Sequence, residues 1–184
     1  MQERRKVVPR ATGRVLEVGV GTGLNLGLYD RERVDRVWGL DPSGVLLDRA
    51  AARPPTDGVD VRLLAGSAED IPFNDAAFDT VVSTYTMCTI PNLGRALGEI
   101  RRVLRRGGRL LFSEHGLSPD GRVARWQRWL SPCWCVLSGG CNVNRPIARS
   151  IESAGFRILG VDAAYLPGPR LLTYTSTGTA ARNS

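Results

Sequence analysis

A glycine-rich turn directly after an apolar run constrains the fold of this chain more than any other feature. The run covers residues 14–20, and the turn follows in the segment Glu17-Val-Gly19-Val-Gly21-Thr-Gly23. Glycines at this spacing let the backbone turn tightly and leave room for a ligand, because no Cβ stands in the way. A buried strand, such a turn and then a helix are typical of an open α/β sheet that binds a ligand beyond its strand ends.

The spacing within the turn separates two classes of ligand. A dinucleotide site has the spacing G-x-G-x-x-G, but Leu24 stands where its third glycine belongs, and Glu17 lies two residues before the first glycine. A carboxylate here disfavours a pyrophosphate, and with it a nicotinamide-dependent dehydrogenase, and favours a cationic ligand. A turn that only packs a strand on a helix is the remaining alternative.

Short apolar runs alternate with longer helical patterns along the chain, which predicts βαβ units and a parallel sheet. Strands are predicted at residues 14–20, 34–40, 59–64, 78–84, 109–114, 156–163 and 171–177. Helices are predicted at residues 24–29, 41–53, 93–105, 120–137 and 146–154. The last two strands are expected to pair antiparallel at the sheet edge.

Length, hydropathy and charge limit the kinds of protein that this chain can be. A chain of 184 residues suits one domain, so we expect residues 1–184 to form a single domain. No stretch approaches the ~20 apolar residues that span a bilayer, and no secretory signal is visible, which favours a cytoplasmic protein. The net charge of +7 is concentrated in residues 95–157, which hold twelve arginines against four acidic residues.

Two further segments are predicted at the same edge of the sheet as the glycine turn. Asp41 ends the second predicted strand, where an acid accepts hydrogen bonds from ribose hydroxyls or else caps the following helix. The loop of residues 65–73 follows the third strand and brings acidic and backbone groups to this edge.

Five segments of the chain resemble, in their order, the motifs of class I S-adenosylmethionine-dependent methyltransferases. They are LEVGVGTG, GLDPS, AGSAEDIPF, FDTVVSTYTMCTIPN and RVLRRGGRLLFSEHG. The resemblance spans nearly the whole chain. It implies an α/β, Rossmann-like, doubly wound fold: a seven-stranded, mostly parallel sheet with an antiparallel last strand and helices on both faces. It also implies S-adenosylmethionine as cofactor and S-adenosylhomocysteine as product.

The resemblance also implies where the cofactor binds, with its methionine part near the glycine turn, its ribose on Asp41 and its adenine beside the loop after the third strand. The residues expected to bind it are Glu17, Gly19, Gly21, Thr22, Gly23, Asn25, Asp41, Pro42, Ser67, Ala68, Glu69, Ser83 and Thr84. The chain departs from the family at Ser67, where an aspartate is usual, so Glu69 or Asp70 is expected to take over that contact.

A second departure lies at the N-terminus. Only about 13 residues precede the first predicted strand, whereas related enzymes carry helices there that cover the cofactor and shape the acceptor pocket. We therefore expect a short or truncated N-terminal lid.

The C-terminal half resembles the thiol S-methyltransferases and their bacterial relatives. The resemblance rests on Cys88 in TYTMCTIPN, on Ser113-Glu-His115 and on WQRWLSPCWCVLSGGCNVNR. It implies a thiol acceptor. His115, the only histidine, is the candidate base because imidazole titrates near neutral pH, and Tyr85 is expected to face the acceptor beside it. A hydrogen-bonded structural role is the alternative for His115.

The four cysteines are expected to be reduced thiols, because they are too few for a disulfide scaffold. The spacing of Cys133, Cys135 and Cys141 does not match a four-ligand zinc site. Since free cysteine often packs as a small apolar residue, the sequence predicts no metal site.

Residues 122–130 form a basic, tryptophan-containing helical stretch. Its arginines are Arg122, Arg125 and Arg128, and its large apolar residues are Trp126, Trp129 and Leu130. Such a helix can lie on an anionic membrane surface, line the acceptor pocket with its tryptophans turned inward, or present a solvated arginine face. Nucleic acid is disfavoured as a partner because the segment is rich in aromatic residues and cysteine.

The sequence thus predicts an S-adenosylmethionine-dependent methyltransferase acting on a small, hydrophobic acceptor, with a thiol favoured. The alternatives are N-, O- or C-methylation of a phospholipid or quinone, and a cofactor-binding scaffold without turnover. The oligomeric state is not predicted.

Overall fold

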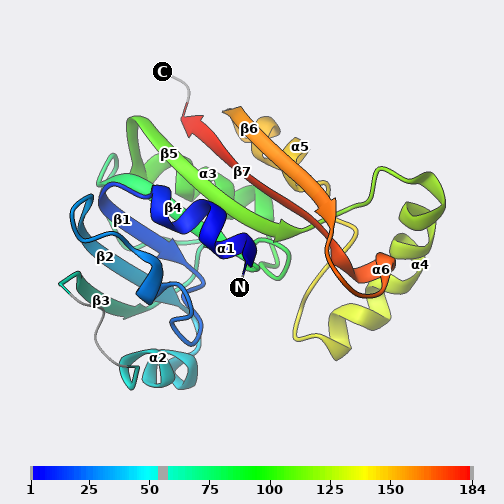
Figure 1. Cartoon of the computed structure of the whole chain (residues 1–184), viewed down its shortest axis with the longest axis horizontal. Coiled ribbons are helices and arrows are strands. Elements are labelled where there is room, and N and C mark those ends of the chain that lie inside the picture. Colours follow the sequence, from blue (N-terminus) through cyan, green and yellow to red (C-terminus); the bar gives the residue numbers. More distant parts are fainter. Residues whose placement is uncertain (1, 54–57, 183–184) are drawn as a thin grey trace.

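The structure is a computed structural model that describes residues 2–53 and 58–182. Seven strands form one sheet in the order β3-β2-β1-β4-β5-β7-β6 (Figure 1). The strands are β1 (Gly13–Val18), β2 (Val34–Asp41), β3 (Asp60–Ala65), β4 (Phe78–Thr84), β5 (Leu104–His115), β6 (Phe156–Tyr165) and β7 (Tyr174–Arg182). The first five are parallel, whereas β7 is antiparallel to both of its neighbours, β5 and β6. This confirms the predicted fold class, including the antiparallel last strand.

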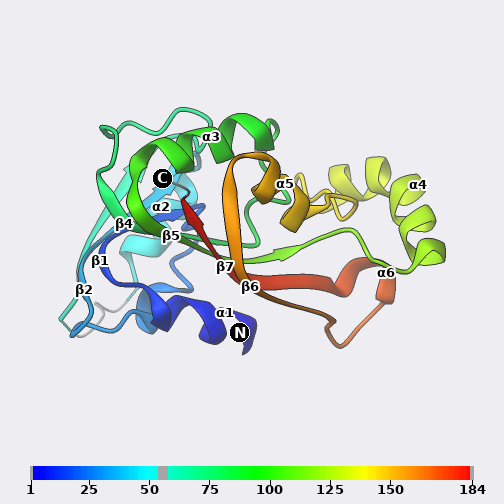
Figure 2. The same cartoon turned by 90° about the horizontal axis from the view of Figure 1, so that it is seen from above.

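Helices cover both faces of the sheet. They are α1 (Gln2–Val7), α2 (Gly44–Ala51), α3 (Leu93–Val103), α4 (Gly121–Leu137), α5 (Ile147–Ser153) and α6 (Arg170–Thr173). Figure 2 shows α1 on one face and α3 and α5 on the opposite face. The helices α4 and α6 lie beyond the sheet, and we call them the lobe (Figure 1).

The core is split by the sheet into two layers, because successive side chains of a strand point to opposite faces. In β5, Leu110 and Phe112 pack in the layer below α3 and α5, whereas Leu111 packs in the layer that contains Val7 and Val8. All five side chains are buried. The strand β5 therefore packs in both layers of the core, which fixes the position of its last residues.

The lobe is tied to the sheet by a buried amide. The side chain of Gln127 on α4 accepts a hydrogen bond from the backbone N–H of Ser118 (2.8 Å) and donates to the carbonyls of Gly116 (3.2 Å) and Leu171 (3.1 Å). Because Gln127 is fully buried, these three backbone groups have no ready access to water in its place. The amide therefore fixes α4 to the chain just after β5 and to α6.

Three predicted elements differ from the structure. The predicted helix at residues 24–29 is only a 3-10 turn, Leu26–Leu28, because the preceding glycine turn runs directly into it. The helix α3 ends at Val103, and β5 begins five residues before its predicted start because Leu104 already pairs with Phe78 of β4. Residues 170–173 are helical, and the last strand runs from Tyr174 to Arg182.

The short segment before β1 folds and packs on the sheet. The helix α1 lies against β5 and β7. Its buried Glu3 accepts a hydrogen bond from the hydroxyl of Thr177 on β7 (3.1 Å) and pairs with Lys6 (2.8 Å). These contacts fix α1 beside the carboxyl ends of the parallel strands.

Candidate active site

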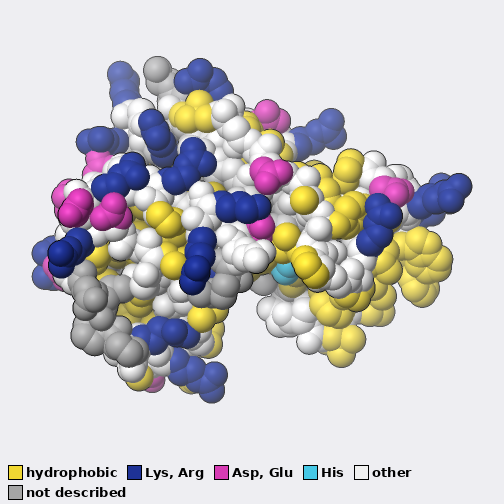
Figure 3. Space-filling view, viewed as in Figure 1, with side chains coloured by type: hydrophobic (Ala, Val, Ile, Leu, Met, Phe, Trp, Pro, Cys, Tyr) yellow, Lys and Arg dark blue, Asp and Glu magenta, His cyan; other side chains and the backbone are white. Residues whose placement is uncertain are grey.

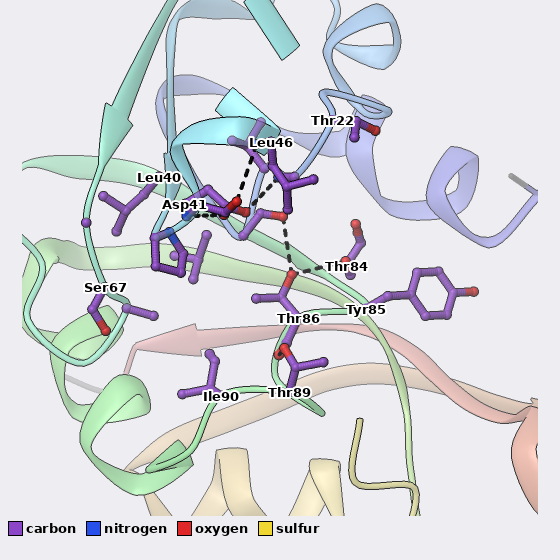
Figure 4. A pocket seen from close by; sticks show the side chains of 18 of the residues that line it. Thr22, Leu40, Asp41, Leu46, Ser67, Thr84, Tyr85, Thr86, Thr89 and Ile90 are labelled. Atoms are coloured by element: carbon purple, nitrogen blue, oxygen red, sulfur yellow. Dashed lines mark hydrogen bonds between the residues drawn. The ribbon is translucent and has the colours of Figure 1, made fainter. Parts of the chain in front are cut away.

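A cavity of about 450 Å³ lies at the carboxyl edge of β1, β2 and β4. Figure 4 shows Asp41 and Leu46 on one side of it and Thr86, Thr89 and Ile90 on the opposite side, with Ser67 at one end and Tyr85 at the other. A volume of this size is typical of a site for a ligand of drug-like size. The predicted site residues that line it are Gly19, Gly21, Thr22, Asp41, Pro42, Ser67, Ala68, Glu69, Thr84 and Tyr85.

Two residues of the glycine turn, Gly19 and Gly21, require glycine for different reasons. Gly19 has a φ of +69°, and a Cβ there would lie 2.2 Å from the side chain of Thr86. Gly21 has a φ of +54°, but a Cβ there would meet nothing closer than 4.0 Å. Gly19 is therefore required by packing, and Gly21 by its left-handed backbone conformation. Together they bring bare backbone to the cavity wall.

Asp41 joins the glycine turn to the end of β2. One carboxylate oxygen accepts the backbone N–H of Gly21 (2.9 Å) and the other accepts that of Ser43 (2.9 Å). The helix α2 is capped by Ser43, whose hydroxyl accepts from the N–H of Leu46, so the interpretation of Asp41 as the N-cap is wrong. Each carboxylate oxygen has a further lone pair, so Asp41 can also accept hydrogen bonds from a ligand in the cavity.

Glu17 is buried behind the cavity wall and does not line the cavity. Its two oxygens accept hydrogen bonds from the amide of Asn25 (2.9 Å) and the hydroxyl of Tyr29 (2.7 Å). Burial raises the pKa of the Glu17 carboxyl to about 7, against the lowering effect of these two hydrogen bonds and of the Arg4 charge. Glu17 therefore organises the turn from behind, where it makes no direct contact with the space that a ligand would fill.

Three other residues that were expected to bind the cofactor also lie outside the lining: Gly23, Asn25 and Ser83. The amide of Asn25 donates to both Glu17 and the hydroxyl of Thr84 (3.0 Å). The hydroxyl of Ser83 donates to the buried carboxylate of Glu114 (2.8 Å). Asn25 and Ser83 thus support the lining residues from behind.

Arg4 on α1 reaches the cavity although the sequence analysis did not single it out. Its guanidinium donates to Asn25 (2.9 Å) and Thr84 (2.5 Å), and it lies 5.1 Å from the centre of the Tyr85 ring. Among the described residues that line the cavity it is the only basic one. No local sequence pattern indicates that Arg4 reaches the cavity, since it is one of four basic residues between positions 4 and 10. Only the packing of α1 on the sheet selects it.

The far end of the cavity is formed by the loop of residues 65–73. Ser67, Ala68 and Glu69 line the cavity, whereas Asp70 does not. The Glu69 carboxylate accepts the backbone N–H of Asn92 (3.0 Å), which ties the loop to the start of α3. Of the two acids that were expected to replace the usual aspartate, only Glu69 stands at this cavity.

The rings of Tyr85 and His115 pack against each other at the opposite end, tilted by 56°. The centres of their rings are 4.7 Å apart. Tyr85 has a φ of +55°, which is unusual for a residue with a bulky side chain, and its backbone N–H donates to the carbonyl of Ser113 (2.9 Å). Tyr85 lines the cavity, whereas His115 stands behind it. The backbone conformation of Tyr85 is thus held by β5 at the point where the strand ends.

A buried carboxylate organises the loop that follows β4. Glu114 accepts hydrogen bonds from the backbone N–H groups of Thr86 (3.0 Å) and Cys88 (3.4 Å), besides the hydroxyl of Ser83. Burial raises the pKa of the Glu114 carboxyl despite these bonds. The loop that carries Tyr85 and Cys88 is therefore anchored to β5.

Cys88, His115 and Cys141 come together beside this loop, and we call them the Cys-His cluster. Their ligand atoms lie within 4.8 Å of one another, with Cys141 Sγ 3.9 Å from His115 Nδ1. The hydrogen bond between the thiols lowers the pKa of Cys141 and raises that of Cys88. Spacing along the chain instead groups Cys141 with Cys133 and Cys135, which lie on α4.

Two tryptophans of α4, Trp126 and Trp129, do not turn inward, whereas Trp134 packs against the two cysteines of the Cys-His cluster. Trp126 is 57% exposed and Trp129 is 73% exposed, and they pack edge to face with ring centres 5.6 Å apart. The interpretation that they line the acceptor pocket is therefore wrong. Val136 and Leu137 near the end of α4 are more than 80% exposed, and Figure 3 shows apolar side chains gathered on the lobe.

Comparison with known proteins relates this chain to methyltransferases. The sequence profile of the methyltransferase domain family matches residues 16–112. The chain is 35% identical to thiol S-methyltransferase TMT1B of Homo sapiens, over 79% of this chain and 62% of that protein. It is 36% identical to phosphatidylethanolamine N-methyltransferase of Cereibacter sphaeroides, over 65% of this chain and 59% of that protein. The chain thus spans about three fifths of the length of these relatives.

Solved structures share the fold. The YcgJ protein of Bacillus subtilis superposes with a TM-score of 0.78 over 100% of this chain and 99% of that one, at 16% sequence identity. At this identity the likeness concerns the fold alone.

Proposed function

Because the chain belongs to the methyltransferase domain family, we propose that it binds S-adenosylmethionine in the cavity and methylates a small, apolar acceptor, with a thiol favoured. The observation that carries the proposal is the joint presence of the bare glycine turn, Asp41 and Arg4 around one cavity. When bound, the cofactor supplies an electrophilic methyl group on a sulfonium ion. The protein must bind and orient it, exclude water and bring the acceptor in line.

The cavity suits each part of this cofactor. Asp41 offers carboxylate lone pairs to ribose hydroxyls. Ser67, Ala68 and Glu69 surround the end where adenine is proposed to bind, with Leu40 and Ile90 as apolar neighbours. At the other end, the backbone of Gly19 and Gly21 leaves room for the methionine part, whose charged groups require partners.

Arg4 is the proposed partner of the cofactor carboxylate. Its guanidinium is held by Asn25 and Thr84 and by the face of Tyr85, so its direction is set before a ligand arrives. A charge-assisted hydrogen bond contributes about 1.5–3 kcal/mol. This assigns α1 the role of a lid that supplies a binding group.

This role can be tested with one variant and two ligands. Arg4→Met is expected to weaken S-adenosylmethionine binding by about 10- to 100-fold in calorimetric titration. It should have little effect on binding of a decarboxylated analogue, which lacks the group that Arg4 contacts. Arg5→Met, on the exposed side of the same helix, is the matched control. Equal losses for both ligands would refute the carboxylate contact.

Two arguments favour thiols as acceptors. The chain is related to thiol S-methyltransferases, and methyl transfer to a thiol requires few protein groups. Transfer to a thiol needs a thiolate, an in-line approach and exclusion of water. Tyr85 lies at the end of the cavity where the acceptor would enter, and Gly139, which follows α4, also lines the cavity. His115 stands directly behind Tyr85, where it is the proposed base.

Lipid methylation is the second candidate, and the exposed face of α4 favours it. Trp126, Trp129, Val136 and Leu137 are exposed beside arginines, and an amphipathic basic helix of this kind binds anionic membrane surfaces. Within residues 2–53 and 58–182, no helix has both the length and the apolar character needed to cross a bilayer. A surface contact through α4 is therefore the mode of membrane binding that we propose for this candidate.

The release of S-adenosylhomocysteine separates the candidates. The full chain is incubated with labelled S-adenosylmethionine and either alkyl thiols or anionic phospholipid vesicles. Release with thiols in solution supports the thiol proposal. Release with vesicles alone supports the lipid candidate and should be lost in Trp126→Ala/Trp129→Ala. Cofactor binding without release in either tube would refute turnover on both acceptor classes and favour the scaffold alternative.

A further inference from the structure

The Cys-His cluster has the composition and spacing of a metal site, and we propose that Cys88, His115 and Cys141 bind a thiophilic divalent cation, Zn²⁺ in the first place. Two thiolates and one imidazole are the ligands that Zn²⁺ prefers in proteins. Three protein ligands leave one of four tetrahedral positions open to water or a small anionic ligand.

The distances fit such a site with small movements. Tetrahedral Zn²⁺ with bonds of about 2.3 Å to sulfur and about 2.0 Å to nitrogen holds neighbouring ligand atoms roughly 3.5–3.8 Å apart. Cys141 Sγ and His115 Nδ1 are 3.9 Å apart, and all three ligand atoms lie within 4.8 Å of one another. Side-chain shifts of about 1 Å or less would close the site around the ion.

The backbone holds both cysteines in place. The N–H of Asn142 donates to the carbonyl of Cys88 (2.8 Å), and the amide side chain of Asn142 donates to the same carbonyl (3.2 Å). Cys88 is held from the other side by the carboxylate of Glu114. The loop after α4 and the loop after β4 are therefore fastened to each other next to the two sulfur atoms.

The third ligand is held by its neighbours as well. His115 ends β5, and its ring packs against Tyr85 with Nδ1 toward Cys141. Cys88 and Cys141 are 1% and 8% exposed, whereas His115 is half-buried. In Figure 3 the single histidine (cyan) is visible where the lobe joins the sheet. An ion at the cluster would thus be shielded on the sulfur side and reachable from the histidine side.

The charges around the cluster are compatible with a bound dication. Two thiolates neutralise the charge of Zn²⁺. The guanidinium of Arg145 donates to the carbonyl of Met87 (2.5 Å), and the carboxyl of Glu114 accepts the backbone N–H of Cys88 (3.4 Å). These two groups carry opposite charges when ionised. No uncompensated cation would therefore be buried by metal binding.

The site lies next to the cavity of the proposed function but does not depend on it. Tyr85 and Thr89 flank Cys88 in the chain and line the cavity, as does Gly139 two residues before Cys141. A metal-bound His115 could not serve as a base, so the base role proposed above applies only to the metal-free chain. A thiol that took the open position would lose its proton to solvent, because a coordinated thiol is deprotonated. Only this last consequence rests on the proposed function.

The experiment uses the reduced full chain and the metal alone. Titration with Co²⁺, which replaces Zn²⁺ and has visible absorption, is expected to give thiolate-to-cobalt charge-transfer bands and the d–d bands of a tetrahedral ion. About one equivalent should saturate the signal, and Zn²⁺ should displace it. Cys88→Ser, Cys141→Ser and His115→Asn should each weaken metal binding at least about 100-fold, since loss of a ligand's partner alone costs ~10–100-fold.

Cys133→Ser and Cys135→Ser are the matched controls, because they remove thiols of α4 outside the cluster. They should leave the cobalt spectrum unchanged. A second measurement on the unaltered protein guards against variants that fail to fold. In moderate urea, where local opening exposes buried thiols, Zn²⁺ should slow alkylation of Cys88 and Cys141 while Cys133 stays equally reactive. The proposal is overturned if the reduced protein gives no tetrahedral cobalt spectrum, or if the α4 variants abolish it. The expectation that the chain binds no metal would then stand.

Discussion

Glu17 allows a quantitative test of how the glycine turn is organised. Its carboxyl is buried, with Asn25 and Tyr29 donating to its two oxygens. Burial raises the pKa of this carboxyl from an ordinary 4.5 to about 7. The folded protein therefore holds the Glu17 proton more tightly than the unfolded chain does.

The sign of the pH dependence follows from this difference. Below about pH 4.5 the carboxyl is protonated in both states, so it adds no pH-dependent cost. As the pH rises toward 7, the unfolded chain has lost the proton and the folded protein retains it, so stability falls by about 1.4 kcal/mol per pH unit. The total loss contributed by Glu17 is about 3 kcal/mol, complete once the pH exceeds 7.

Glu17→Gln removes the titration and nearly preserves the shape of the side chain. The free energy of unfolding is measured by urea denaturation of both proteins from pH 4 to pH 8, without cofactor. The variant is expected to gain about 3 kcal/mol relative to the natural protein across this range. Glu152→Gln on the exposed side of α5 is the control and should show no such gain. A constant difference between Glu17→Gln and the natural protein would refute the reasoning.

Three further substitutions test the cavity, the sheet edge and the lobe. Asp41→Asn should weaken S-adenosylmethionine binding by about 10- to 100-fold in calorimetric titration, because a donor replaces a charged acceptor, whereas the exposed Asp48→Asn on α2 should not. Gly178→Ala should lower the free energy of unfolding by about 2 kcal/mol, because its Cβ would lie 2.5 Å from the carbonyl of Gly160. Gly160→Ala, whose Cβ meets nothing within 4 Å, should change it by less than about 1 kcal/mol, and equal effects would contradict this reasoning. Gln127→Leu leaves three backbone groups unpaired and should cost about 3 kcal/mol in chemical denaturation, so an unchanged stability would mean that water replaces the amide.

Much of the sheet and of the cavity was predictable from local patterns. The apolar run before Gly19, the alternation of strands and helices, and the acid at Asp41 are all encoded by neighbours in the chain, so they can be recognised without the fold. The carboxyl ends of parallel strands meet at one edge by the geometry of the sheet. For this reason Gly21, Asp41 and Ser67 could be expected around one cavity before their distances were known.

The residues at which helices and strands begin and end were less predictable, because pairing between distant segments decides them. Leu104 and Arg105 continue the predicted helix in the sequence, but Leu104 pairs with Phe78 and extends β5. The four-residue helix α6 likewise interrupts a stretch that favours a strand, and it is held by contacts with α4. In both places tertiary contacts outweigh the local preference.

Local sequence patterns determined the succession of strands and the functional residues that follow each strand. The tertiary structure alone decided which of these side chains share a site. Arg4 meets Thr84 across 80 positions of the chain because α1 packs on the sheet. Cys141 meets Cys88 and His115, and not its near neighbour Cys135, because the loop after α4 folds back onto the ends of β4 and β5. Spacing along a chain carries information over a few residues, but contacts between distant residues depend on strand order and on how helices pack. Those are properties of the whole fold.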